Sequence, residues 1–191
     1  MANRKELFKD VKKIVVKIGT SSLTTKEGKF NKDFAIEVAR QVSLLKSEDK
    51  DIILVSSGAI GTGCEVLEFK ERPKSIPLKQ ATAAVGQGIL MHEWSEVFKE
   101  FGLKVAQILL TYDAFSDRKT YLNLRNSMTV LLELGVIPII NENDPICVHE
   151  IGETFGDNDT LSAMVSSKVE ADLLILMTDI DGLYTKNPKK S

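Results

Sequence analysis

The segment VIPIINEND, residues 136–144, joins an apolar run to a cluster of acids and amides. The run 136–140 is typical of a strand buried in a parallel sheet. A second cluster, GDND at 156–159, leads directly into a segment that predicts the start of a helix. One cluster therefore ends a strand and the other begins a helix, where ligand crevices form in open α/β sheets. Carboxylates and amides at such an edge suit a small charged substrate and a phosphate-bearing partner.

The rest of the chain alternates strand and helix patterns. Buried strands are predicted at 14–18, 52–55, 105–110 and 173–177. Helices are predicted from the N-cap Asn31, over about 78–98, from Ser116 or Asp117 to Leu134, and after Asp159. This order predicts an α/β fold with a mainly parallel sheet sandwiched between helices. The carboxyl ends of the strands would then share one edge.

Composition excludes several classes of protein. The 191 residues, with a net charge of −2, suit one domain spanning 1–191 and lack the basic surface of a nucleic-acid binder. No secretory signal and no apolar run long enough to cross a bilayer is visible. Cys64 and Cys147 have no metal-like spacing, so we expect no metal site and reduced thiols. We therefore expect a cytoplasmic protein without membrane or nucleic-acid partners.

Lys17 lies inside an apolar strand, where an unpaired ammonium is costly. It could be an edge-strand lysine whose amino group reaches solvent. It could equally direct its charge at phosphate oxygens, with the backbone and hydroxyls of 19–22 beside it. Its position before Gly19 favours the second interpretation.

The glycine-rich segment 57–63, SGAIGTG, follows the second strand. It matches neither the dinucleotide-binding fingerprint nor the P-loop. An ordinary tight turn is the simpler explanation, but its place at the end of a strand favours close approach of a ligand to the backbone.

The aspartates have two possible roles. Asp157 and Asp159 could cap the helix that follows them, which is the commoner role of such residues. One aspartate suffices for a cap, however, and Asn158 lies between the two, so the surplus favours a ligand. Asp144 could bind an amino group.

Several segments in the expected order resemble the amino acid kinase family, and within it the glutamate 5-kinase group. They are 15–21, 56–60, 84–87, 138–144, 156–163 and 178–184. The NEND and GDND segments are the most specific to that group. The resemblance implies ATP-dependent phosphorylation of the γ-carboxylate of L-glutamate, the first step towards proline. It also implies proline as a feedback inhibitor and a homo-oligomer.

The resemblance also implies roles for particular residues. Lys17 would contact the ATP phosphates, and Asp159 would organise the catalytic lysines. Ser57, Asp144 and Asn158 would bind glutamate, and Cys147 to Phe155 would form a flap over it. Thr178 and Asp179 would belong to the nucleotide pocket. Mg²⁺ would be carried on the ATP phosphates.

Family members continue well beyond Pro188, through a glycine-rich segment with a second active-site lysine. We therefore expect a domain that is incomplete at its C-terminus, with weak or no kinase activity alone, low stability or association. The alternatives are a glutamate- or proline-binding regulatory module or partner subunit, and another carboxylate kinase such as acetylglutamate kinase or aspartokinase.

Overall fold

A five-stranded parallel sheet forms the centre of the computed structural model, which describes residues 6, 8–25, 29–147, 158–178, 182 and 185. The strand order is β3-β4-β2-β1-β5, and all the registers are parallel. The fold class predicted from the alternating pattern is thereby confirmed. The strands are β1 (Lys13–Ile18), β2 (Asp51–Ser56), β3 (Lys104–Leu110), β4 (Val136–Glu142) and β5 (Leu173–Met177).

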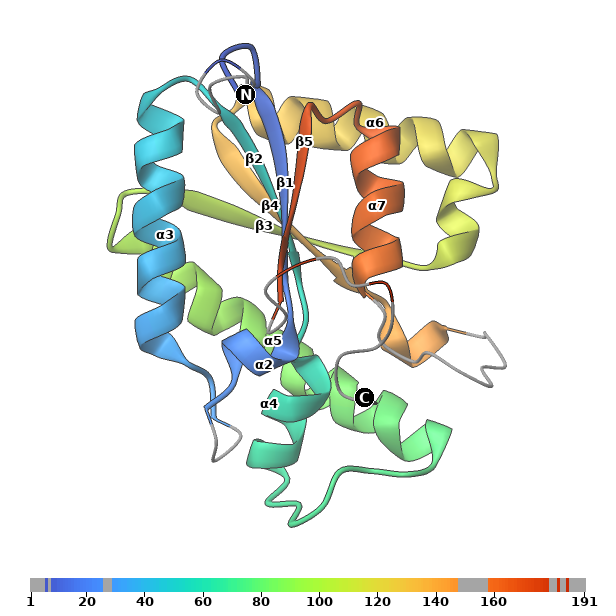
Figure 1. Ribbon diagram of the computed structural model, residues 1–191. Coiled ribbons are helices and arrows are strands. Elements are labelled where there is room, and N and C mark those ends of the chain that lie inside the picture. The colour runs from blue at the N-terminus through green and yellow to red at the C-terminus, as the bar shows by residue number, and fades with distance from the viewer. Residues whose placement is uncertain are drawn as a thin grey trace.

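Helices cover both faces of the sheet (Figure 1). On one face, α3 (Lys32–Ser47) and α5 (Ile76–Lys99) bury a core against Ile14, Val16 and Ile18 of β1. On the other face, α6 (Arg118–Glu133) and α7 (Asn158–Lys168) pack against Val15. Because side chains alternate along a strand, Lys17 shares the α7 face with Val15.

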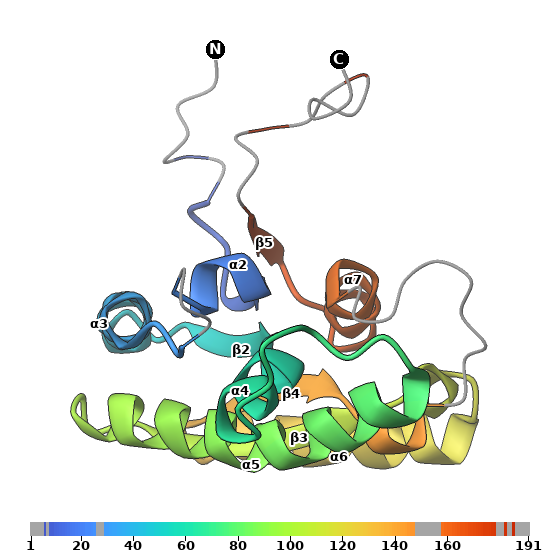
Figure 2. The ribbon, with the colours of Figure 1, turned by 90° about the horizontal axis from the view of Figure 1, so that it is seen from below.

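Short elements gather where the strands end. These are α2 (Thr20–Leu23), α4 (Ala59–Val66) and the 3₁₀ turns η1 (Tyr112–Phe115) and η2 (Asp144–Ile146). Figure 2 views the molecule from this end, with α2 and α4 in the foreground. Those predicted polar residues that the structure describes therefore lie along one edge of the sheet, as the parallel topology requires.

Two predicted helix starts are confirmed by their caps. The Asn31 side chain accepts a hydrogen bond from the Phe34 backbone N–H at 3.2 Å, and Asp117, not Ser116, accepts one from Thr120 N–H at 2.7 Å. One boundary prediction was wrong. Strand β4 continues through Glu142, so Asn141 and Glu142 are strand residues instead of following the strand. Pairing with β3 holds them in register as far as Leu110.

Strand β5 forms one edge of the sheet, and its Ile175 and Leu176 side chains are exposed. Strand β1 is interior, between β2 and β5. None of the helices in the described ranges is long and apolar enough to cross a membrane.

Candidate active site

A polar cavity of about 120 Å³ opens at the carboxyl edge of the sheet, between β2, β4 and the start of α7. The turn between β2 and α4 contributes Ser57 to Gly61, and β4 and η2 contribute carboxylates and an amide. The other lining residues come from α2, the loop after α4, and α7. The side chains that we discuss below are Ser57, Arg72, Asn141, Glu142, Asp144 and Asn158.

Asn158, the first residue of α7, is buried in the wall of this cavity. Its Nδ2 donates to Ser57 Oγ at 2.7 Å, to the Ser56 carbonyl at 3.1 Å and to Asn141 Oδ1 at 3.1 Å. The Ser56 carbonyl can only accept, so the orientation of the Asn158 amide is determined. Its Oδ1 is buried and has no hydrogen-bond partner in the described part of the chain. A buried acceptor left in this way favours a ligand that donates a hydrogen bond.

Asn141 holds Asn158 in place from β4. Its Oδ1 accepts from the Glu142 backbone N–H at 2.9 Å, and its Nδ2 donates to Gln87 Oε1 of α5 at 2.7 Å. The indole of Trp94, also on α5, donates to Ser56 Oγ at 3.0 Å. Helix α5 therefore supports the ends of both β2 and β4 beneath the cavity.

The backbone at the start of α4 forms a second wall. Gly58, which precedes the helix, has φ = 111°, a conformation that residues with a Cβ rarely adopt. No described side chain caps α4, so the first N–H groups of the helix remain available to an anion. A Cβ on Gly63 would come within 1.9 Å of the Thr82 carbonyl oxygen, and one on Gly86 within 1.9 Å of the Ala59 carbonyl oxygen. These two glycines let α4 and α5 pack at backbone contact.

Two carboxylates, Glu142 and Asp144, face the cavity from the end of β4. Burial, and to a smaller extent the negative charge of Glu142, raises the pKa of Asp144 to about 7. The Cys147 thiol donates to Glu142 Oε1 at 2.8 Å, and the Gln80 side chain donates to the Cys147 carbonyl at 3.1 Å. A cationic group entering here would face two acidic side chains, and its charge would favour the ionised form of Asp144.

Lys17 forms an ion pair with Asp159, at 2.5 Å between Nζ and Oδ1. The lysine side chain is 11% exposed and the aspartate side chain is 52% exposed. The interpretation of Lys17 as an edge-strand lysine is wrong, because β1 is interior and its Lys17 side is covered by α7. A Cβ on Gly19 would lie 3.4 Å from Nζ, so the glycine after the strand leaves space beside the ammonium.

The structure brings together five of the seven predicted site residues: Lys17, Ser57, Asp144, Asn158 and Asp159. Thr178 lies just beyond the end of β5 and is exposed. Asp179, Asp157 and nearly all of the predicted flap, 148–155, lie outside the described residues. The predicted roles of all seven residues stay predictions.

Sequence reasoning missed several contributors to the site. Gln87 contacts the cavity only through Asn141, and Trp94 only through Ser56. Arg72 comes from a loop that carries no motif. The α-helical period of α5 could have indicated that Gln87 and Trp94 share a side of the helix, since they are seven residues apart. Nothing in the local sequence indicates that 72 reaches the cavity.

The site offers hydrogen-bond acceptors to an ammonium group, backbone donors to an anion, and a lysine charge at the end of β1. This combination suits a zwitterionic ligand with a further negative charge. Phosphoryl transfer asks a protein mainly for positioning and charge stabilisation, both of which such a set can supply.

Comparison with known proteins gives a consistent result. The sequence profile described as "Amino acid kinase family" matches residues 12–191. The chain is 65% identical over 190 residues to a protein named glutamate 5-kinase from Methanococcoides burtonii, covering all of this chain and 51% of the relative. It is 56% identical to the protein of that name from Methanosarcina mazei, again covering 51% of it.

A shorter relative is covered more fully. The protein named glutamate 5-kinase from Clostridium acetobutylicum is 50% identical over 98% of this chain and 70% of its own length. The chain thus spans about half the length of the first two relatives and over two thirds of the third. The parallel sheet, the ordered motifs and these matches lead to one conclusion: the chain belongs to the amino acid kinase family.

Proposed function

We propose that this chain carries the acceptor site of a glutamate 5-kinase, which transfers a phosphoryl group from ATP to the γ-carboxylate of L-glutamate. The observation that carries the proposal is that two consecutive residues, Asn158 and Asp159, make contacts of different kinds. Asn158 belongs to the buried amide network of the cavity, whereas Asp159 pairs with Lys17. An amino acid bound by the first would have its reactive end close to the second.

The amino-acid side of the site would recognise the ammonium group of glutamate. The unpartnered Asn158 Oδ1 would accept from it, and Asp144 would supply the opposite charge. The Ser57 hydroxyl accepts from Asn158 Nδ2, so its own hydrogen is left for a carboxylate oxygen. The named relatives support glutamate as the amino acid.

The phosphoryl side would stabilise developing charge. The first N–H groups of α4 and the Lys17 ammonium both offer positive charge at the end of β1 and β2. The acceptor is already a carboxylate, so no strong general base is needed. Asp159 would hold the Lys17 ammonium in position, and Thr178 and Asp179 would contact the nucleotide.

Mg²⁺, when bound, would neutralise charge on the ATP phosphates. Within the described ranges no group of three or more histidine, cysteine or acidic side chains is arranged to hold a metal ion. We expect the nucleotide phosphates to supply most of the Mg²⁺ ligands.

Calorimetry with this chain tests the proposal directly. L-Glutamate should bind, and Ser57→Ala should weaken it by about tenfold through loss of one hydrogen bond to a charged group. Ser47→Ala, at the end of α3 and far from the cavity, should bind as the parent does. Glutamate-dependent ADP release, with the acyl phosphate trapped by hydroxylamine, tests transfer. Binding or transfer restricted to L-aspartate or N-acetylglutamate would defeat the assignment.

A glutamate-binding regulatory module is the second candidate. It is favoured by the fact that Ser57, Asp144 and Asn158 line the cavity, whereas Lys17, Asp159 and Thr178 are not among its described lining residues. Glutamate binding without any measurable ATP binding would support this candidate over the kinase.

A further inference from the structure

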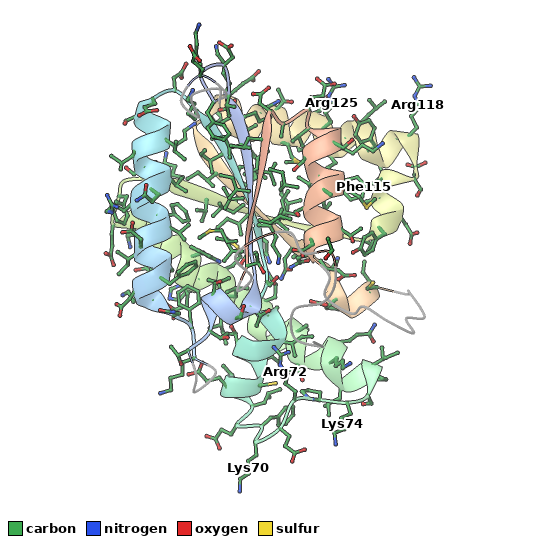
Figure 3. The ribbon with its side chains drawn as sticks, in the orientation of Figure 1. Lys70, Arg72, Lys74, Phe115, Arg118 and Arg125 are labelled. Carbon is green, nitrogen blue, oxygen red and sulfur yellow. The ribbon has the colours of Figure 1, made fainter. Side chains whose placement is uncertain are left out.

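Arg72 lies in the loop between α4 and α5 and lines the cavity. It is the one cationic side chain among the described lining residues. Within the described part of the chain it forms no ion pair or hydrogen bond, although its charge acts on the pKa of Cys64 in α4. Figure 3 shows Arg72 beside α4, whereas Lys70 and Lys74 of the same loop lie further out. The guanidinium is therefore free to bind a ligand.

The charges of the site leave one substrate group without a partner. This step rests on the proposed function. Glutamate carries one ammonium and two carboxylates, and the ammonium suits Asn158 Oδ1 and Asp144. The γ-carboxylate must face Lys17, where transfer would occur. The α-carboxylate then needs a cation, because Glu142 and Asp144 make the remaining cavity wall acidic.

We infer that the Arg72 guanidinium binds the α-carboxylate of the acceptor amino acid and so selects glutamate over an otherwise identical molecule that lacks this carboxylate. The planar guanidinium can hold both oxygens of a carboxylate at once. Because Arg72 and Asn158 line the same cavity, the guanidinium can contact a ligand that is bound to the Asn158 network. Arg72 would be a specificity residue, without a role in the transfer step itself.

Two probes separate this role from a structural one. L-Glutamate carries the α-carboxylate, and 4-aminobutyrate is the same molecule without it. Calorimetry should show that the parent chain binds glutamate at least tenfold more tightly than 4-aminobutyrate. Arg72→Gln should weaken glutamate binding by about ten- to hundredfold and leave 4-aminobutyrate binding unchanged. Arg72→Lys should keep part of the glutamate affinity.

Lys74→Gln is the matched control, since Lys74 is exposed and pairs only weakly with Glu71 at 4.0 Å. It should bind both probes as the parent does. Unchanged glutamate affinity in Arg72→Gln, or an equal loss for both probes, would overturn the role of Arg72 and leave the proposed function standing. Should 4-aminobutyrate be too weak to measure, equal losses in Arg72→Gln and Arg72→Lys would overturn it. Failure of the parent chain to bind glutamate would overturn the proposed function as well.

Discussion

The two sides of the cavity are built in different ways. On the amide side, Asn158, Asn141 and Gln87 form a chain of hydrogen bonds that runs from α7 through β4 to α5. On the lysine side, Lys17 has Asp159 as its ion-pair partner, and that carboxylate is 52% exposed. A buried network fixes a single geometry, whereas a partly solvated ion pair can exchange partners at small cost. The amide side is thus held in one geometry and the Lys17 charge can shift; in the proposed function the first would recognise the amino acid and the second would serve phosphoryl transfer.

The largest effect on stability should come from displacing the start of α4, the wall of the cavity that the amide side and the lysine side share. Gly86→Ala would force its Cβ against the Ala59 carbonyl oxygen, so we expect a loss of about 3 kcal/mol or more in the free energy of unfolding. Glutamate binding should also be lost, because α4 cannot keep its place. Thermal and urea denaturation measure the first effect and calorimetry the second.

Gly88→Ala is the control on the same helix. Nothing lies within 4 Å of a Cβ at Gly88, so this change should be neutral or stabilise by up to about 1 kcal/mol. Equal stability of the two variants would show that the close contact of α4 and α5 is not needed.

Removing Asn158, the central residue of the amide side, should have the next largest effect on stability. Asn158→Ala leaves Ser56, Ser57 and Asn141 without their shared donor, at a cost of about 2–3 kcal/mol in the free energy of unfolding. Glutamate affinity should fall below detection by calorimetry. Asn143→Ala, in the same acidic and amide cluster, should change neither quantity by more than about 0.5 kcal/mol. A stable Asn158→Ala variant that still binds glutamate would contradict the claim that the Asn158 network fixes the amide side.

The protonation of Asp144 should make the stability of the chain depend on pH. The pKa of Asp144 is about 7 in the folded chain, against an ordinary value of 3.8, so the folded state holds more protons than the unfolded state between these values. Stability should therefore fall as pH rises from about 4 to 7. Asp144→Asn should remove this dependence and gain on the order of 1–3 kcal/mol at pH 8. Urea denaturation at pH 5, 6.5 and 8 measures both.

The same group should link glutamate binding to proton release. An ammonium beside Asp144 favours its charged form, so the affinity should fall by up to about tenfold for each pH unit below 7. Calorimetry at pH 6.5 in phosphate and in Tris counts the protons released. Identical heats in the two buffers would mean that Asp144 does not take the ammonium.

The smallest effect on stability should come from the lysine side of the cavity. Lys17→Ala breaks an ion pair whose carboxylate remains in water, so the free energy of unfolding should change by less than about 1 kcal/mol. ATP affinity should nevertheless fall by tenfold or more, because the charge directed at the phosphates is gone. Lys12→Ala, on the exposed residue just before β1, is the control and should retain both properties. A large loss of stability in Lys17→Ala would place the ion pair among the rigid elements.

The sequence allowed prediction of the sheet and of the residues at its carboxyl edge because both follow from local pattern. Apolar runs mark the five strands, and parallel topology places Lys17, Ser57, Asp144 and Asn158 at one edge. Contacts made through a second residue have no such pattern. Gln87 reaches the site through Asn141 of β4, and Gly63 and Gly86 let α4, which precedes the Arg72 loop, pack directly against α5. Tertiary approach, and not residue type, determines these positions.

Trp94 is the one tryptophan of the 191 residues, and its indole N–H donates to Ser56 Oγ directly beneath the cavity. The Ser56 carbonyl is in turn a hydrogen-bond acceptor for Asn158. The chain therefore contains its own fluorophore, linked through Ser56 to Asn158, the residue that would contact the amino acid. Occupation of the cavity can be followed by intrinsic emission, without a label and without any need for turnover.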